Sequence, residues 1–394
     1  MGLEGFLNAL KKATDKLVTS GFREALIIHH DEADGVCSAA IAAKSLKRAG
    51  FGFKTICIDK LYPEVLRGIY SRGAGLYVFT DIGSAHVKLV EKETPEGSLT
   101  IMLDHHDTTE SERPDVLNLN PELWGLSGER DASASTVAYL FAKALSPDNV
   151  DLSSLAVIGA AEIPGPFTGL NMLALKDALE NEVVEPRGKA GYRVLNLGKP
   201  LSYKRYSTLL SVLASVGYYK GGPSRALRAC MDGFEDRDYE EASKLEEERR
   251  RANATLLTRL RRGGLRRMEA IQWFSDGGVY RGMGTKVIGS FCSYLRYQRF
   301  IDQDKYIVGY MDVLPEIPGY GRLSKEYVKL STRAPRPLTQ DILNGRKPPL
   351  SKILPEACSR HGGFADGHAV AASGVVEKDK VMELLKTLDE LAKS

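Results

Sequence analysis

Short apolar runs alternate with helix-like patterns through the first part of the chain. The runs have the length of strands and lack a strict polar alternation, which is typical of strands buried on both faces of a parallel sheet. Such strand–helix alternation predicts an α/β fold with helices on both faces of the sheet. The expected strands are residues 25–30, 54–58, 76–80, 99–103 and 116–119, and the expected helices are 4–18, 38–49, 63–71, 84–93, 133–143 and 151–163.

The pattern changes after Gly233. Residues 235–262 are almost continuously charged at helical spacing and end at two glycines, which favour a helix stop. We interpret this stretch as a long connecting helix. The predicted organisation is a first domain over residues 1–232, a connector over 233–265 and a smaller α/β domain over 266–394. The elements expected after the connector are strands at 270–277, 305–313 and 327–333, helices at 285–299 and 379–391, and a surface loop over 334–350.

Length and composition limit the number of domains, the partners and the cellular compartment. At 394 residues the chain exceeds the size at which one core usually stops growing, which agrees with two domains. The net charge of +3 is small, so a nucleic-acid partner has to be argued from local charge. The five scattered cysteines form no C-x-x-C pair, which favours a reducing compartment without disulfides or structural zinc. Because no apolar run reaches membrane length and no signal-peptide pattern is seen, we expect a cytoplasmic protein without a membrane partner.

Acidic and histidine residues follow three of the predicted strands. Parallel strands expose their carboxyl ends to one shared crevice, and carboxylates and imidazoles are ligands for divalent metals. The clusters therefore predict an active site that holds metal. They are His30, Glu32 and Asp34; Asp81; and Asp104, His105 and His106.

The spacing within the clusters suggests roles. On an extended segment His30, Glu32 and Asp34 would point the same way and converge on metal. Asp34 and Asp81 are expected at exposed strand ends without core packing, and Asp104 is expected to orient the two histidines. The alternatives are a solvated turn, helix capping at Asp81 and a histidine-rich surface loop.

A different signal lies near the C-terminus, in residues 360–374. Its glycines bring the backbone close to a ligand and offer N–H groups to an anion, and its two histidines add donors. Arg333, at the end of a predicted strand, is a candidate phosphate clamp. The alternative is an ordinary glycine loop. The candidate residues are Gly362, Gly363, Gly367 and His368, with His361 beside them.

Taken together, these residues resemble the DHH phosphoesterase superfamily. The motif of that name is Asp104-His105-His106, after an H-x-D-x-D-G-like segment at 30–35 and the isolated Asp81. The C-terminal stretch is similar to the GG…GH-x-x-AA-x-G signature of the accessory DHHA1 domain. Domain order and the charged connector look most like the RecJ-like branch, particularly its archaeal members. The resemblance implies a parallel-sheet DHH domain joined by a long helix to a smaller DHHA1 domain.

The resemblance also implies two Mn²⁺ ions, with Mg²⁺ as an alternative, in a cleft between the domains. His30, Glu32 and Asp81 would hold one ion, and Asp34, Asp81, His105 and Glu162 the other. His106, oriented by Asp104, would face the scissile phosphate. Arg333 and the loop containing Gly362, Gly363, Gly367 and His368 would grip the nucleotide.

Two residues depart from the family pattern. The family usually has aspartate where Glu32 stands, and aspartate in the region where this chain offers Glu162 at a spacing one residue shorter. Glutamate keeps the charge but moves it outward by one methylene. We favour a working site with altered geometry, with Asp31 as a candidate compensating ligand, over a degenerate site.

The leading hypothesis is a manganese-dependent exonuclease that hydrolyses single-stranded DNA or RNA by a two-metal mechanism. The arginines at 249–251 have glutamates beside them, whereas the later cluster lacks such partners and is the better candidate for nucleic-acid contact. One alternative is a phosphoesterase acting on short oligonucleotides or cyclic dinucleotides. Another is a non-catalytic replication or repair scaffold, and a replisome or repair protein is an expected partner. The later cluster is Arg259, Arg261, Arg262, Arg266 and Arg267.

Overall fold

The computed structural model describes residues 2–188 and 191–393. The chain divides into two compact units. The first comprises Met1–Ser243 with Ile317–Gly321, and the second comprises Lys244–Glu316 with Arg322–Ser394. The first unit holds the three acidic and histidine clusters.

A five-stranded sheet forms the centre of the first unit, in the order β2-β1-β3-β4-β5. All four strand pairs are parallel, which confirms the predicted parallel sheet. His29 pairs with Thr80, and Thr80 pairs with Leu103, so three neighbouring strands end level with one another. The strands are β1 (Glu24–His29), β2 (Gly52–Cys57), β3 (Leu76–Thr80), β4 (Leu99–Leu103) and β5 (Val116–Leu119).

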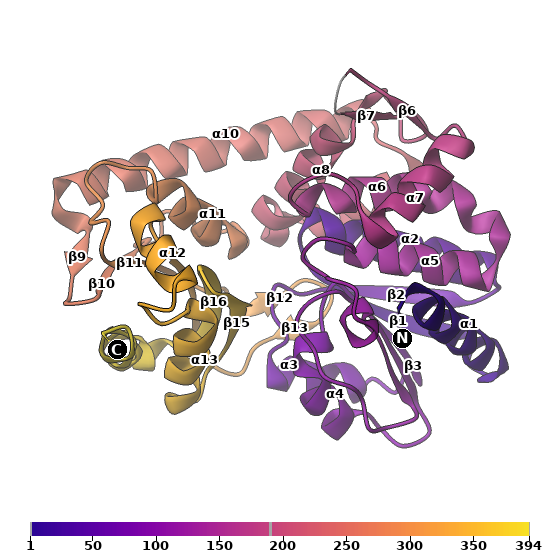
Figure 1. The fold of residues 1–394 in the computed structure, drawn as a ribbon, viewed down its shortest axis with the longest axis horizontal. Coiled ribbons are helices and arrows are strands. Elements are labelled where there is room, and N and C mark those ends of the chain that lie inside the picture. The colour runs from indigo at the N-terminus through magenta and orange to yellow at the C-terminus, as the bar shows by residue number, and fades with distance from the viewer. Residues whose placement is uncertain (1, 189–190, 394) are drawn as a thin grey trace. The chain divides into compact units, whose positions relative to one another are not determined.

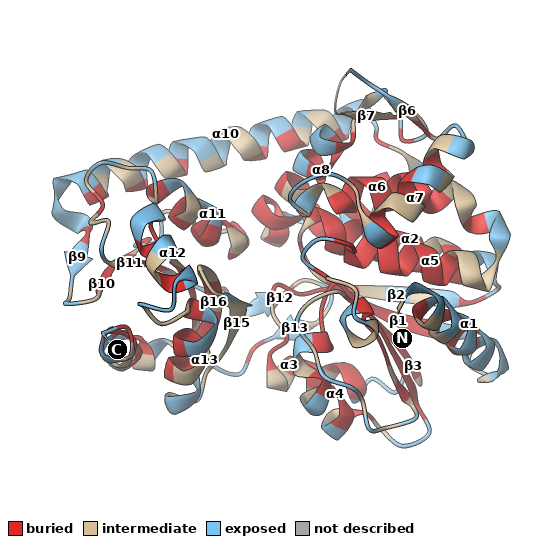
Figure 2. Cartoon of the chain, in the orientation of Figure 1, coloured by how far each residue is buried: buried red, intermediate tan, exposed pale blue. Residues whose placement is uncertain are grey.

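Helices cover both faces of this sheet, with α3 and α4 on the opposite side from α2 and α5 (Figure 1). Helix α2 is buried along most of its length, as are α5 and α6 (Figure 2). A small three-stranded sheet lies beyond them. The elements are α1 (Leu3–Thr19), α2 (Ala33–Arg48), α3 (Pro63–Tyr70), α4 (Val87–Glu93), α5 (Ala134–Leu145), α6 (Ser153–Gly159), α7 (Gly169–Glu180), α8 (Tyr203–Ser211), α9 (Gly222–Asp232), β6 (Val184–Pro186), β7 (Tyr192–Val194) and β8 (Leu201–Ser202).

The second unit is built on a six-stranded mixed sheet in the order β15-β16-β14-β11-β10-β9. Only β10 and β11 pair in parallel among its described strands. Apolar residues of the sheet pack with α12, α13 and α14 in one core. The elements are β9 (Arg266–Arg267), β10 (Ile271–Ser275), β11 (Tyr306–Asp312), β14 (Tyr327–Arg333), β15 (Phe364–His368), β16 (Ala371–Glu377), α11 (Lys286–Leu295), α12 (Arg336–Leu343), α13 (Leu350–Arg360) and α14 (Val381–Leu391).

The expected connector is a helix, α10 (Asp236–Arg259), and the boundary between the units falls within it. A one-turn π-helix at Leu260–Gly264 follows, with Gly263 at φ 105°. The short hairpin β12 (Glu316–Ile317) and β13 (Gly321–Arg322) carries the segment that belongs to the first unit. There the Tyr320 hydroxyl donates to the carbonyl of Glu64 at 3.2 Å.

Four sequence expectations about local structure were wrong. The helix expected from residue 38 begins at Ala33, so the first cluster is not one extended segment. The single helix expected over 151–163 is divided into α6 and short 3₁₀ turns. The expected loop at 334–350 contains α12, because prolines in a helix's first turn lack only an N–H that needs no partner there. The expected glycine-rich loop is largely strand β15.

Candidate metal centre

The level ends of β1, β3 and β4 bring the three clusters side by side. His30 N–H donates to the carbonyl of Thr80 at 3.4 Å, and Asp81 N–H donates to that of Leu103 at 3.0 Å. The strands therefore stay paired for one residue beyond their ends. As a result the side chains that follow them enter one shared space, as the strand-end pattern predicts.

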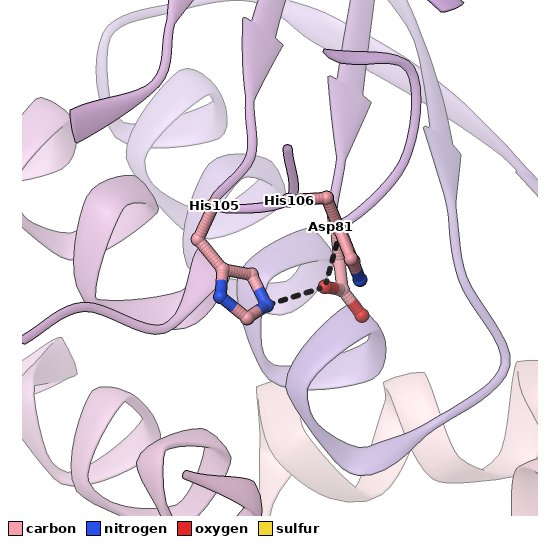
Figure 3. A group of neighbouring side chains, drawn as sticks. All are labelled: Asp81, His105 and His106. Carbon is pink, nitrogen blue, oxygen red and sulfur yellow. Dashed lines mark ion pairs between the residues drawn. The ribbon is translucent and has the colours of Figure 1, made fainter. Parts of the chain in front are cut away.

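Asp81 lies at the centre of this group (Figure 3). Its Oδ1 is 3.5 Å from Nε2 of His105 and 4.0 Å from Nδ1 of His106, and its Oδ2 is 3.4 Å from Nδ1 of His30. Burial opposes ionisation of Asp81, but His105 and His30 outweigh it and hold the pKa of this carboxyl well below its usual range. The two carboxylate oxygens of Asp81 thus face different imidazoles.

The backbone of Asp81 is in the left-handed region, at φ 60°. Such a conformation is uncommon outside glycine and is concentrated at functional sites. The side chain is also buried, contrary to the expectation of an exposed strand end. This backbone conformation turns the Asp81 carboxylate toward the group directly after strand β3 ends.

His105 is fixed by a backbone contact. Its Nδ1 donates to the carbonyl of Gly128 at 2.7 Å, which leaves Nε2 facing Asp81 and, at 3.7 Å, Oδ2 of Asp34. Burial lowers the affinity of the ring for a proton, but the surrounding carboxylates prevail and raise the pKa of His105 to about 10. This nitrogen therefore faces enough negative charge to hold a cation.

His106 is fixed by Asp104. Its Nδ1 lies 2.7 Å from Oδ1 of Asp104, so that Nε2 is the ring nitrogen left for other partners. Asp104 is buried and also accepts hydrogen bonds from the N–H groups of Ser84 and His105. Burial opposes ionisation of Asp104, but His106 overcomes it and lowers the pKa of the carboxyl. The geometry is that of an orienting acceptor.

Asp34 lies in the first turn of α2 and is buried, which corrects its expected place at an exposed strand end. Its two oxygens accept hydrogen bonds from the N–H groups of Ala134 and Ser135, both at 2.8 Å, where α5 begins. A Cβ on Gly159 would lie 2.4 Å from Oδ1 of Asp34, so this carboxylate needs a glycine beside it. Burial, followed by the charge on Asp81, raises the pKa of Asp34. Asp34 therefore has a structural role as well as a place in the group.

The imidazole of His30 lies between carboxylates on two sides. Nδ1 is near Asp81 and lies 3.8 Å from Oε2 of Glu32, whereas Nε2 is 3.4 Å from Oδ1 of the fully buried Asp31. Burial opposes a proton on His30, but Asp81, Asp31 and Glu32 together raise its pKa. Asp31 is placed to orient the ring from the side opposite Asp81.

Glu162 lies at the start of α2. Its Oε1 accepts hydrogen bonds from the N–H of Ala33 at 3.0 Å and from the hydroxyl of Ser211 at 3.3 Å. The side chain thus caps the helix that carries Asp34. Local sequence gave no sign of this contact, because the partners are far apart along the chain.

The donor set fits a divalent cation. Within the described part of the chain, ligand atoms of Asp81, His105 and His106 lie within 4.8 Å of one another. His30 and Asp34 each approach this group through the ion-pair distances above. Nδ1 of His30 is buried and makes no hydrogen bond of good geometry among the described residues. Mixed carboxylate and imidazole donors around such a nitrogen suit Mn²⁺ or a similar ion.

The candidate nucleotide-binding residues lie in the second unit. Arg333 donates to the hydroxyl of Ser293 and to the carbonyl of Thr332, both at 2.8 Å. A Cβ on Gly363 would lie 2.3 Å from the carbonyl of Val375, and one on Gly367 would lie 2.4 Å from Cα of Ala372, so close strand pairing requires both glycines. Gly362 precedes β15, and His368 is exposed at its end. His361 instead bonds Thr387 on α14.

Residues 24–160 match the family model described as the DHH family, N-terminal domain. The chain thus contains a segment that matches the DHH N-terminal domain and holds the strand-end group, followed by a mixed α/β second unit.

Three proteins are similar to this chain in sequence or fold. An uncharacterized protein of Methanocaldococcus jannaschii is 24% identical over 446 residues, covering 98% of this chain and 97% of the relative. RecJ of Thermus thermophilus, solved in complex with Mn²⁺, has a TM-score of 0.66 at 16% identity, covering 100% of this chain and 55% of that chain. CDC45 of Entamoeba histolytica has a TM-score of 0.60 at 9% identity, covering 98% and 99%.

The two solved structures share only the fold with this protein. The chain spans 55% of the length of the Thermus RecJ. In the described residues no helix combines the length and apolar character needed to cross a membrane.

Proposed function

We propose that this protein is a metal-dependent phosphodiesterase that acts as a RecJ-like exonuclease on single-stranded DNA or RNA. The observation that carries the proposal is the convergence of Asp81, His105 and His106, with His30 and Asp34 beside them, at the ends of parallel strands. Carboxylates and imidazoles gathered around one buried carboxylate are what a divalent-metal hydrolase requires.

The proposed metal ligands fall into two sets that share Asp81. His30 and Glu32 lie on the side of Oδ2, whereas His105 and Asp34 lie on the side of Oδ1. This arrangement supports Asp81 as a ligand that both sets would share in holding Mn²⁺ or Mg²⁺. Glu162 would join the second set through its other carboxylate oxygen, because Oε1 accepts hydrogen bonds from Ala33 and Ser211. A pair of bound ions supplies an activated water and neutralises charge during in-line displacement.

The remaining residues would act on the substrate. His106, with Nδ1 held by Asp104, would direct Nε2 toward the scissile phosphate and stabilise its developing charge. In the second unit, which we assign as the DHHA1 domain, Arg333, Gly362, Gly363, Gly367 and His368 would hold the nucleotide. A partner in a replisome or repair complex remains part of this proposal.

One observation favours a second candidate, a catalytically degenerate scaffold. Glu162 caps α2 and is absent from the tight group of ligand atoms found among the described residues. CDC45 shares the fold. Against this candidate, His30 contacts Asp81 and Asp34 contacts His105, so both remain linked to the group, and both Asp34 and Asp104 are fixed by backbone N–H groups.

The test is cleavage of end-labelled single-stranded DNA and RNA, from two to about thirty nucleotides, with Mn²⁺ or with EDTA. The proposal predicts Mn²⁺-dependent shortening of the long strands. Activity limited to the shortest substrates would instead indicate a small-nucleotide phosphoesterase. No cleavage of any substrate would support the scaffold. An Asp81→Asn variant controls for contaminating nucleases, and Glu96→Gln, at an exposed site, is the matched charge control.

A further inference from the structure

The loop at residues 296–300, in the second unit, presents an exposed aromatic ring. Tyr297 is 64% exposed, and it is one of the few large hydrophobic residues exposed to this extent in the described part of the chain. The guanidinium of Arg336, on α12, lies 5.7 Å from the centroid of that ring. Tyr294, one helical turn earlier, is 46% exposed. Tyr297 therefore presents an aromatic ring that has a cation beside it and is open to solvent.

Arginines from other elements converge on the same loop. Arg261, in the turn after α10, donates to Oε1 of Gln298 at 3.1 Å and lies 5.8 Å from the ring centroid of Phe300. Arg267, on β9, donates to the carbonyl of Phe300 at 3.2 Å. The loop's own Arg296 bonds the hydroxyl of Thr339 on α12. The arginine–tyrosine surface consists of Arg261, Arg267, Arg296, Tyr297, Arg299 and Arg336.

The positive charge of this surface is uncompensated. None of its five arginines pairs with a carboxylate among the described residues. The contrast with α10 is direct, since Arg249, Arg250 and Arg251 pair with glutamates of the preceding turn at 2.7–2.8 Å. The sequence-based expectation of glutamate partners for that triplet is confirmed. Charge on α10 is thus neutralised locally, whereas charge around Tyr297 is left for an external anion.

Strand geometry divides the arginine cluster that the sequence pointed to. Neighbouring residues of β9 point to opposite faces. Arg267 reaches the 296–300 loop, so Arg266 points the other way, where its guanidinium lies 5.2 Å from the ring centroid of Trp273. Arg259 is half-buried and donates to the carbonyl of Ser275. Only part of the cluster therefore belongs to the surface.

We propose that the arginine–tyrosine surface binds single-stranded nucleic acid outside the metal centre. Its guanidinium groups would contact successive phosphates, and Tyr297 would stack on an unpaired base. The exposed ring selects this partner over an acidic protein or a duplex, because only a single strand offers both phosphates and free base faces. Figure 1 labels β9 and α12, which carry Arg267 and Arg336, and α11, which the loop follows. The substrate class follows from the proposed function, whereas the location rests on these contacts.

The test is the anisotropy of a fluorescein-labelled 20-nucleotide single strand, titrated with the full chain in EDTA. Stacking predicts that Tyr297→Ala weakens binding roughly 5- to 150-fold and that Tyr297→Phe, which keeps the ring, binds as the wild type does. Each phosphate contact contributes about 0.7 to the slope of log affinity against log salt. Arg267→Ala should lower that slope by about 0.7, whereas its matched control Arg266→Ala should not.

The proposal is overturned if the wild type does not bind the strand, if Tyr297→Ala binds as tightly as Tyr297→Phe, or if Arg266→Ala and Arg267→Ala are equally impaired. Equal loss of duplex binding in Tyr297→Ala would also contradict base stacking. Because EDTA removes the metal, binding is measured apart from hydrolysis. A protein that binds through Tyr297 but never cleaves with Mn²⁺ contradicts only the proposed function, and one that cleaves without needing Tyr297 contradicts only the surface.

Discussion

Replacing Asp81 with asparagine removes the charge at the centre of the group while keeping the shape of the side chain. Asparagine tolerates the left-handed backbone better than most residues, so φ 60° at this position adds little strain to the variant. The substitution thus separates the electrostatic role of Asp81 from its structural one. Asp34→Ala is less suitable, because two N–H groups of α5 would lose their acceptor.

The size of the effect can be worked from the distances. Two unit charges separated by the 3.5 Å between Asp81 and His105 interact by about 5 kcal/mol at an effective dielectric constant of about 20. That energy corresponds to a change of about 3.5 in a pKa. The pKa of His105, raised to about 10 in the wild type, is expected to fall to about 6.5 in metal-free Asp81→Asn.

An NMR titration of the histidine rings in metal-free protein measures this pKa. Calorimetric titration with Mn²⁺ should show affinity lowered at least about 100-fold, since loss of a supporting residue alone typically costs 10- to 100-fold. Glu96→Gln should change neither quantity. The reasoning is refuted if the pKa of His105 stays near 10 in Asp81→Asn, or if that variant binds Mn²⁺ as tightly as the wild type.

Three further predictions follow from the same contacts. The pKa of His105 is raised from 6.5 to about 10, so its contribution to stability is complete below pH 6.5 and is lost as pH approaches 10. Urea titrations of metal-free protein should therefore show the free energy of unfolding falling by a few kcal/mol across that window, and a flat profile would contradict the assignment. Gly159→Ala would place Cβ 2.1 Å from Oγ of Ser135, so it should destabilise the fold by about 1–3 kcal/mol, whereas Gly52→Ala, with its nearest neighbour at 3.7 Å, should not. Asp31→Asn should loosen the ring of His30 and weaken Mn²⁺ binding about 10-fold by calorimetry, and unchanged affinity would show that Asp31 does not position it.

The strand-end group could be predicted from sequence because its cause is local. Apolar runs define the parallel strands, and residues that follow level strands share one edge. The order of strands and helices along the chain was therefore enough to predict that the three clusters meet. Even so, the pattern predicted exposed carboxylates, whereas Asp34 and Asp81 are buried among partners from α5 and the neighbouring strand ends.

Long-range contacts account for what sequence reasoning missed. Helix α2 begins five residues before its expected start, with its first N–H bonded to Glu162 and Ser211 rather than to a local cap. His105 is fixed by a backbone carbonyl, that of Gly128, and a backbone group cannot be recognised from residue type. The split of Arg266 from Arg267 depends on which face of β9 each residue occupies. None of these features is encoded in a short window of sequence.

The most direct test of the central claim is single-turnover cleavage of an end-labelled single strand by metal-depleted protein, before and after Mn²⁺ is added back. The account predicts no cleavage without metal, recovery with Mn²⁺ in the wild type, and no recovery in Asp81→Asn. Cleavage in EDTA, or equal recovery in Asp81→Asn, would contradict a metal centre built on Asp81.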